Sequence, residues 1–346
     1  MYSYASLCRA LSATDAPQEE ACLLLAHFCG VGRAELLCDR DRLYGNDALD
    51  AAVRQRLTGY PLQYILGEWY FFGCRFRVSP ACLIPRPDTE VLVEAGLERV
   101  EKGAAVADLC TGSGCIATAL LVSHHDIALC AGLELFPETL ALAQENAARN
   151  GVGDRFLPIC ADLLTDGADR LHAALRGRLP GRQDARLDMI LSNPPYIRRA
   201  ELPGLAQELA YEPRAALDGG EDGLTFYRAI LNRFGDLLRP GGWLLLEIGC
   251  GQANLVDAGE RRMLYKTQQL HARRLLYRFM TTLREVGERA WWLHEGENLG
   301  VPKVDGSNQA QALMRLCVLT LKRSSELTVC LPIEEVERYV IFEEDI

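Results

Sequence analysis

The sequence lacks the cysteine spacing of a metal or redox motif. Its 346 residues include 13 cysteines, and none forms a Cys-x-x-Cys pair, the spacing that zinc ribbons and thioredoxin-like sites use. Pairing all of them in disulfides, as in a secreted protein, would leave one thiol over. We therefore expect no metal site, and reduced cysteines that pack as small apolar side chains in the cytoplasm.

Positive charge is scarce and long apolar runs are missing. Lys and Arg total 37 against 47 for Asp and Glu, whereas a protein that holds nucleic acid mainly through phosphate contacts is usually basic. The early apolar run Ala21–Phe28 is too short to cross a bilayer. No basic segment precedes an apolar run at the start, as a signal peptide requires. We expect a cytoplasmic monomer that binds neither a membrane nor nucleic acid.

The first part of the chain has helical periodicity. Asp15 is predicted to cap a helix that has Pro17 in its first turn and Gly30 past its end. A second helix is predicted after Asn46, where apolar residues recur every four positions. We therefore expect a helical domain over residues 1–66.

Short aromatic or β-branched runs follow on both sides of Gly73 and predict a hairpin, within a linker over residues 67–87. After the linker, strand and helix patterns alternate. The predicted strands are Val106–Leu109, Ile127–Glu134, Phe156–Cys160, Leu187–Ser192 and Trp243–Ile248, and the clearest predicted helices are Ile116–Val122 and Pro137–Asn150. Strands separated by helices imply an α/β fold with a doubly wound parallel sheet, which we expect over residues 88–256.

The final segment, residues 257–346, is atypical compared with the alternating strand and helix pattern before it. Arg261–Val286 predicts a long helix with an apolar stripe and a basic start. Such a helix could pack its stripe on a core and expose its basic face to solvent, or it could face RNA. The runs Ala290–Leu293 and Leu316–Leu321 could add strands that complete the sheet.

Small residues follow the first predicted strand of the sheet. The run Asp108 to Gly114 includes two glycines and opens a helix, so its backbone N–H groups can approach a ligand closely. Glu134 ends the next strand, 22 residues after Gly112, where an acid can accept both hydroxyls of a ribose. The Gly-Lys-Ser/Thr of a triphosphate loop is missing. A nucleoside cofactor, NAD or S-adenosylmethionine, is left.

A second motif, Asn193-Pro194-Pro195-Tyr196, directly follows the apolar strand that ends at Ser192. It therefore lies at the carboxyl edge of the sheet, where ligands bind. The Asn193 side-chain oxygen and the Pro194 carbonyl can together accept both hydrogens of a planar NH2 group, and Tyr196 can pack on its flat face. Hydride transfer has no use for such a clamp, whereas methyl transfer to an amide or exocyclic amine does. The motif favours S-adenosylmethionine over NAD.

With these motifs the chain resembles the HemK/PrmC family, protein-(glutamine-N5) methyltransferases of peptide-chain release factors. The resemblance extends to about Gly251. Besides the glycine loop and Asn193-Pro194-Pro195-Tyr196, it rests on Pro61-Leu62-Gln63-Tyr64-Ile65-Leu66-Gly67, Ile84-Pro85-Arg86-Pro87-Asp88-Thr89-Glu90 and Tyr211-Glu212-Pro213-Arg214-Ala215-Ala216-Leu217 before Gly219-Gly220.

The resemblance implies a Rossmann-like class I methyltransferase domain that uses S-adenosyl-L-methionine, and a helical N-terminal domain that docks class 1 peptide-chain release factors. The substrate would be the glutamine of their Gly-Gly-Gln loop. By position in the family's motifs, the cofactor would be held by Cys110, Thr111, Gly112, Ser113, Gly114, Glu134, Leu163 and Asn193. Asn193, Pro194, Pro195 and Tyr196 would bind the glutamine, with Asn193, Pro194 and Tyr196 as catalytic residues. Cys110 stands where the family usually has glycine, and Glu134 replaces its usual aspartate.

Two other functions stay open. The same clamp fits the exocyclic amino group of a base, so the chain could methylate DNA or RNA, which would require a basic surface and a way to present the base. A binding module without activity is the second alternative. Labelled S-adenosylmethionine offered with a release factor or with nucleic acid would distinguish the three.

Overall fold

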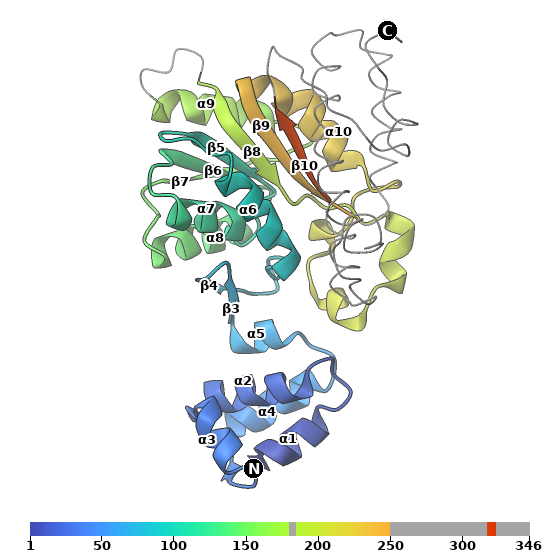
Figure 1. The fold of residues 1–346 in the computed structure, drawn as a ribbon. Coiled ribbons are helices and arrows are strands. Elements are labelled where there is room, and N and C mark those ends of the chain that lie inside the picture. The colour runs from blue at the N-terminus through green and yellow to red at the C-terminus, as the bar shows by residue number, and fades with distance from the viewer. Residues whose placement is uncertain (180–184, 250–316, 323–346) are drawn as a thin grey trace, which may run out of the picture. The chain divides into compact units, whose positions relative to one another are not determined.

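The computed structural model describes residues 1–179, 185–249 and 317–322, and the chain divides into two compact units (Figure 1). The helical unit consists of Met1–Trp69, Arg77–Ile84 and Leu205–Pro213, and the sheet unit consists of Tyr70–Phe76, Pro85–Gly204 and the described residues from Arg214 onward. Within the described ranges, no helix is long and apolar enough to cross a membrane.

The helical unit contains short helices and a two-stranded antiparallel ladder. Its elements are β1 (Tyr2–Ser3), α1 (Tyr4–Ala10), α2 (Pro17–Cys29), α3 (Arg33–Cys38), β2 (Leu43–Tyr44), α4 (Asp47–Arg56) and α5 (Leu62–Leu66). Leu7, Leu24 and Leu49 are fully buried where α1, α2 and α4 meet. The short segments hold together because each contributes one apolar face to this common core.

The helix ends follow the predictions with one exception. Gly30 ends α2 in the left-handed conformation, with φ of 67°, and the Asn46 side chain caps α4 by accepting the Leu49 amide at 2.8 Å. The predicted Asp15 cap is wrong, because Ala16 holds the N-cap position without a side-chain hydrogen bond. Since Pro17 is the first helical residue, the cap falls one residue after the aspartate.

A segment that comes late in the sequence belongs to the helical unit. Arg56, 5% exposed, donates to both carboxylate oxygens of Glu20, at 2.7 and 2.9 Å. The same guanidinium pairs with Glu208 at 2.6 Å. Glu212 accepts the Ile84 amide at 3.0 Å. The contacts of Glu208 and Glu212 therefore join Leu205–Pro213 to the rest of the helical unit.

The sheet unit has six strands in the order β10-β9-β8-β5-β6-β7. The strands are β5 (Ala105–Leu109), β6 (Leu129–Glu134), β7 (Phe156–Cys160), β8 (Leu187–Ser192), β9 (Leu238–Ile248) and β10 (Cys317–Lys322). The strands from β5 to β9 are parallel, and β10 pairs antiparallel with β9. The predicted α/β sheet is confirmed. The chain steps outward from β5 to β7 and then returns on the other side of β5, a switch point at which α/β sheets bind ligands.

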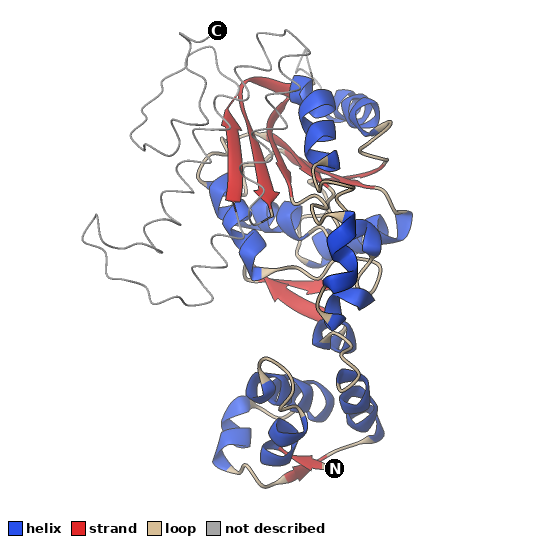
Figure 2. Cartoon of the chain, turned by 90° about the vertical axis from the view of Figure 1, so that its right-hand side faces the viewer, coloured by secondary structure: helices blue, strands red, loops and turns tan. Residues whose placement is uncertain are grey.

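Helices cover both faces of this sheet (Figures 1 and 2). They are α6 (Glu90–Leu97), α7 (Cys115–Ser123), α8 (Pro137–Arg149), α9 (Gly167–Arg178) and α10 (Thr225–Ala229), with further helical turns at Pro87–Thr89, Arg199–Gly204, Arg214–Ala216, Ile230–Phe234 and Gly235–Leu237. One core contains α9 and α10 side chains, and the other contains α6, α7 and α8 side chains. Because alternate strand residues face opposite sides, each strand from β5 to β9 contributes side chains to both cores.

A hairpin forms where the linker was predicted, and a strand forms within the last segment. The predicted hairpin forms from β3 (Glu68–Phe71) and β4 (Cys74–Arg77). The predicted run Leu316–Leu321 overlaps β10, which spans Cys317–Lys322 and whose Cys317 pairs with Ile248. The predicted helix Arg261–Val286 and the run Ala290–Leu293 lie outside the described residues.

Candidate functional site

The loop after β5 is built to bring backbone close to a ligand. Cys110, Gly112 and Gly114 have φ of 59°, 55° and 77°, in the left-handed region that favours glycine. A Cβ at Gly114 would lie 3.0 Å from that of Ala143, so a side chain there would push α8 away. A Cβ at Gly112 would meet nothing within 4 Å. The backbone at Gly112 therefore borders open space.

Buried polar side chains hold this loop in place. Asp108, fully buried on β5, accepts the Thr111 hydroxyl at 2.6 Å and the Ala117 amide at 3.2 Å. The Asn146 amide of α8 donates to the Ser113 carbonyl at 2.9 Å. Burial raises the pKa of Asp108 to about 7, although its two hydrogen bonds act in the opposite direction. The predictions gave Asp108 no role; the available signal was an acid inside an otherwise apolar strand.

Glu134 lies where it was predicted, at the end of β6. Its carboxylate accepts the Gly112 amide at 3.0 Å and the amides of Leu135 and Phe136 at 2.9 and 3.2 Å. Burial raises its pKa, and these backbone hydrogen bonds lower it. The carboxylate is thus fixed beside the glycine loop, as a group that binds a ribose must be.

Two polar atoms near this loop are buried and lack hydrogen-bond partners within the described part of the chain, Asp108 Oδ1 and Ser113 Oγ. Buried polar groups are normally satisfied, so these atoms and the open backbone at Gly112 fit a bound polar molecule. A ribose or an amino-acid-like group of a nucleoside cofactor matches this donor and acceptor set.

Leu163 follows β7 at the same sheet edge, but its side chain is 3% exposed and packs in the core. Any contact with an adenine would involve only the edge of this side chain or its backbone. The predictions missed Leu135 and Phe136, which directly follow Glu134 and stay 47% and 39% exposed. Their signal was an apolar pair between the acid and the start of α8 at Pro137.

The Asn193-Pro194-Pro195-Tyr196 motif adjoins the glycine loop because β8 pairs with β5. Ser192 is in register with Leu109 and donates to its carbonyl at 2.6 Å. The Asn193 amide nitrogen donates to Thr89 Oγ1 at 3.1 Å, and both prolines are buried. The Asn193 side chain is therefore held from the side of the helical turn Pro87–Thr89.

A second segment pairs with the end of this motif. The Ile197 amide donates to the Leu217 carbonyl at 3.0 Å, and the Gly219 amide donates to the Ile197 carbonyl at 2.8 Å. A Cβ at Gly219 would lie 2.7 Å from Tyr196 Cα. The glycine that follows the Tyr211–Leu217 motif thus lets the chain pack against Tyr196.

Thr89 and Glu247 were not among the predicted site residues, although both face Asn193. Glu247, 2% exposed near the end of β9, shares hydrogen bonds with the side chains of Thr89, Tyr196 and Asn193. Burial is the main cause that raises its pKa to about 7. The sequence signal was again an acid in an apolar strand, and its contacts depend on pairing between β8 and β9.

The structure therefore brings the predicted glycine loop, Glu134 and the Asn193 motif to one edge of the sheet, at the ends of β5, β6 and β8. An amide oxygen and a main-chain carbonyl at this edge can accept the hydrogens of a planar NH2 group, and the loop backbone and the Glu134 carboxylate offer hydrogen-bonding groups to a neighbouring polar molecule. Among the described residues, no group of three metal-ligating side chains could bind a metal ion.

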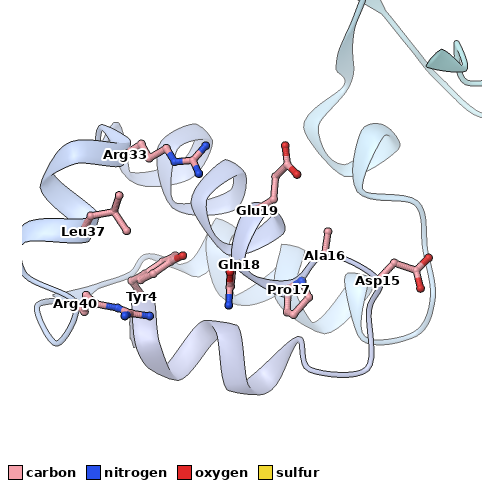
Figure 3. A pocket seen from close by; sticks show the side chains of 9 residues that line it. All are labelled: Tyr4, Asp15, Ala16, Pro17, Gln18, Glu19, Arg33, Leu37 and Arg40. Atoms are coloured by element: carbon pink, nitrogen blue, oxygen red, sulfur yellow. The ribbon is translucent and has the colours of Figure 1, made fainter. Parts of the chain in front are cut away.

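The helical unit has an open pocket of about 660 Å³, drawn in Figure 3. Its lining combines Asp15 and Glu19 with Arg33 and Arg40, and the apolar Leu37 is 51% exposed. The Arg40 guanidinium lies 5.3 Å from the centre of the Tyr4 ring. Mixed charges and an exposed leucine suit contact with a polypeptide surface.

Comparison with known proteins identifies relatives of both parts of the chain. A family model described as the PrmC N-terminal domain matches residues 4–67. The release factor glutamine methyltransferase of Geobacter sulfurreducens is 43% identical over 245 residues, which are 67% of this chain and 77% of the relative. That of Moorella thermoacetica is 40% identical over 268 residues, 75% of this chain and 89% of the relative.

Among solved structures, the hMettl16 catalytic domain aligns with a TM-score of 0.42 at 17% identity, over 66% of this chain and 77% of that one. Membership of the family is shown by the two relatives, which match most of their own length at 40% identity or more. The chain belongs to the release factor glutamine methyltransferases of the PrmC/HemK family, which are S-adenosylmethionine-dependent enzymes.

Proposed function

We propose that this chain transfers a methyl group from S-adenosylmethionine to the side-chain amide nitrogen, N5, of the glutamine in the Gly-Gly-Gln loop of class 1 peptide-chain release factors. The observation that carries this proposal is the position of Asn193-Pro194 at the end of β8, in register with the strand that leads into the glycine loop. A planar amide held there has its nitrogen beside the nucleoside site.

Each part of the site has a role in this proposal. Cys110, Thr111, Gly112, Ser113, Gly114 and Glu134 hold the cofactor, with Leu163 at the adenine edge and Asn193 between cofactor and substrate. The cofactor supplies an electrophilic methyl group on a sulfonium. Asn193 Oδ1 and the Pro194 carbonyl accept the two amide hydrogens, and Pro195 and Tyr196 enclose the glutamine side chain.

The chemistry needs orientation more than strong acid–base catalysis. An amide nitrogen is a weak nucleophile because its lone pair is delocalised into the carbonyl. The two hydrogen bonds align the nitrogen with the methyl carbon and stabilise it as it becomes pyramidal. After methyl transfer the nitrogen loses its extra proton to water.

We further propose that the helical domain, residues 1–66, docks the release factor, and that the protein acts as a cytoplasmic monomer. The pocket that Tyr4 and Arg40 help to line (Figure 3) supports a docking role, since its charges of both signs and exposed Leu37 offer contacts to a folded partner. The domain over residues 88–256 is proposed as the catalytic part, joined to residues 1–66 by the linker 67–87.

Methyl-labelled S-adenosylmethionine tests the proposal. The full-length chain is incubated with a release factor, with the same release factor carrying asparagine in place of the Gly-Gly-Gln glutamine, and with DNA or RNA. Label is expected on the unaltered release factor alone, and peptide mass spectrometry should place it on that glutamine. Label on nucleic acid would favour the alternative substrate, and label on the asparagine variant would place the methyl group elsewhere.

A variant of the clamp tests the site within the same assay. Asn193→Ala is expected to lose most methylation while keeping the circular dichroism spectrum of the wild-type chain. Asn193 is proposed to bind the substrate amide and is not part of the hydrophobic core. Full turnover by this variant would contradict the clamp.

A further inference from the structure

Glu247 is a buried acid for which the proposed mechanism above has no use. It is 2% exposed, one residue before the end of β9. The hydroxyl of buried Tyr227 donates to its main-chain carbonyl at 3.0 Å and so fixes this end of the strand. Glu247 Oε2 is buried with no hydrogen-bond partner among the described residues. A carboxyl group is seldom kept in such a place without a task.

The carboxyl group faces the clamp. It shares hydrogen bonds with the side chains of Thr89, Tyr196 and Asn193, and the negative charge of Asp88 also acts on it. The Asn193 amide nitrogen also donates to Thr89 Oγ1 at 3.1 Å. The Thr89 hydroxyl donates to the Glu247 carboxylate and so lowers its pKa. The hydroxyl oxygen is then left to accept, and both Glu247 and Thr89 require the NH2 group of the Asn193 amide.

This arrangement decides which way the Asn193 amide points. An ionised carboxylate can only accept hydrogen bonds, so the amide must present its NH2 to Glu247 and Thr89. Its oxygen is then left for the substrate. Without an obligate acceptor, the amide could turn over and present NH2 to the substrate, whose own NH2 group it would repel.

We propose that Glu247 is a positioning residue that holds the Asn193 amide oxygen toward the glutamine NH2 group. The proposal rests on the proposed function. Glu247 acts through Asn193 and need not touch the substrate. When it is protonated it can donate to the Asn193 oxygen, and the preference for one amide orientation is lost.

The role gives the reaction a pH dependence. The carboxyl pKa of about 7 means that the active, ionised form is lost as the pH falls through neutrality. The ionisable groups that face it are Asp88, whose charge raises this pKa, and Tyr196, whose hydroxyl lowers it by hydrogen bonding. Asp108 has a pKa of about 7 as well. A variant of Glu247 is therefore needed to show which carboxyl group causes the loss of activity at low pH, the acidic limb of the pH profile.

Glu247→Gln is the test, because glutamine has the shape of the protonated acid and can donate to Asn193. The control is Asp188→Asn, which removes another buried carboxylate, 9% exposed, at the second residue of β8 and thus at the opposite edge of the sheet. Asp188 accepts the Ala105 amide at 2.7 Å and has no part in the clamp. Both variants are assayed between pH 5.5 and pH 9 with saturating S-adenosylmethionine, and cofactor binding is measured by calorimetry.

We expect Glu247→Gln to bind S-adenosylmethionine normally, to lose roughly tenfold or more in kcat/KM at pH 8, and to lack the acidic limb. Asp188→Asn should keep both the limb and the kcat/KM of the wild-type chain. Wild-type kcat/KM and limb in Glu247→Gln would overturn the inference. If that variant does not fold, Glu247→Asp replaces it: its shorter carboxylate should lower kcat/KM and keep the limb, and an unchanged kcat/KM would overturn the inference. Failure of the wild-type chain to methylate a release factor would instead overturn the proposed function.

Discussion

At Cys110 the backbone has φ of 59°, a conformation that glycine adopts freely and that costs other L residues about 1–2 kcal/mol. The residue opens the loop and is not glycine, so this chain carries strain that a glycine would relieve. Burial also raises the Cys110 pKa well above its ordinary value of 9.0, with the charges of Glu134 and Asp108 adding to the effect. The thiol is therefore a poor nucleophile at neutral pH.

Comparing Cys110→Gly with Cys110→Ala isolates the strain, because both variants lose the thiol and only glycine relaxes the backbone. We expect the glycine variant to be more stable by about 1 kcal/mol, less than the full strain because glycine also gains entropy in the unfolded chain. Urea midpoints measure the difference. An alanine variant of equal or greater stability would show that the loop is not strained.

Asp108 makes stability depend on pH. Its pKa is about 7 in the folded chain against an ordinary value of 3.8, so between these values only the folded state holds the proton. Folding is therefore favoured at low pH, and this contribution is lost as the pH rises toward 7. In the wild-type chain this loss lowers the free energy of unfolding by at most about 1.4 kcal/mol per pH unit. Asp108→Asn removes this dependence.

Urea unfolding of the cofactor-free protein at pH 5 and pH 8 tests this prediction. The free energy of unfolding of Asp108→Asn, relative to that of the wild-type chain, should be higher at pH 8 than at pH 5. A difference between the two proteins that does not change with pH would mean that Asp108 is ionised in the folded state throughout.

At the scale of elements, the sequence predicted the sheet better than the site. Apolar runs such as Leu187–Ser192 matched β8 without error, because a buried parallel strand is apolar on both faces. Thr89 and Glu247 were missed, because only the folded chain brings them beside Asn193. Glu247 reaches it through the pairing of β8 with β9, and Thr89 lies in a turn about 100 residues earlier in the chain. Local periodicity carries no information on such contacts.

The pairing between the two loops beside Tyr196 gives a prediction at this scale. Gly219→Ala places a Cβ 2.7 Å from Tyr196 Cα, so one of the two loops must move. We expect a loss of at least about tenfold in kcat, because a small displacement of the clamp misaligns the amide. S-adenosylmethionine affinity should change little.

Gly204→Ala is the matched control, since its Cβ would meet nothing within 4 Å. It should methylate the release factor at the wild-type rate. If both glycine variants are equally active, the fit between Gly219 and Tyr196 does not set the clamp geometry.

For the whole molecule, the division into two units separates cofactor chemistry from the helical part. The glycine loop, Glu134 and the Asn193 motif all belong to the sheet unit, whereas the buried Arg56–Glu20 pair belongs to the helical unit. Damage to one unit should therefore have a different signature from damage to the other.

Arg56→Met tests this separation. It leaves Glu20, 8% exposed, without its cation, which costs about 3–5 kcal/mol when a buried pair is broken. Local opening of the helical unit should then increase, seen as faster amide exchange in α2 and α4, and release factor methylation should fall through a higher KM. S-adenosylmethionine affinity by calorimetry should stay at the wild-type value.

Arg42→Met is the control, because Arg42 and Glu35 form a pair exposed at 58% and 48%, and such surface pairs contribute little. A parallel loss of S-adenosylmethionine affinity in Arg56→Met would show instead that the sheet unit depends on the helical unit for its cofactor site.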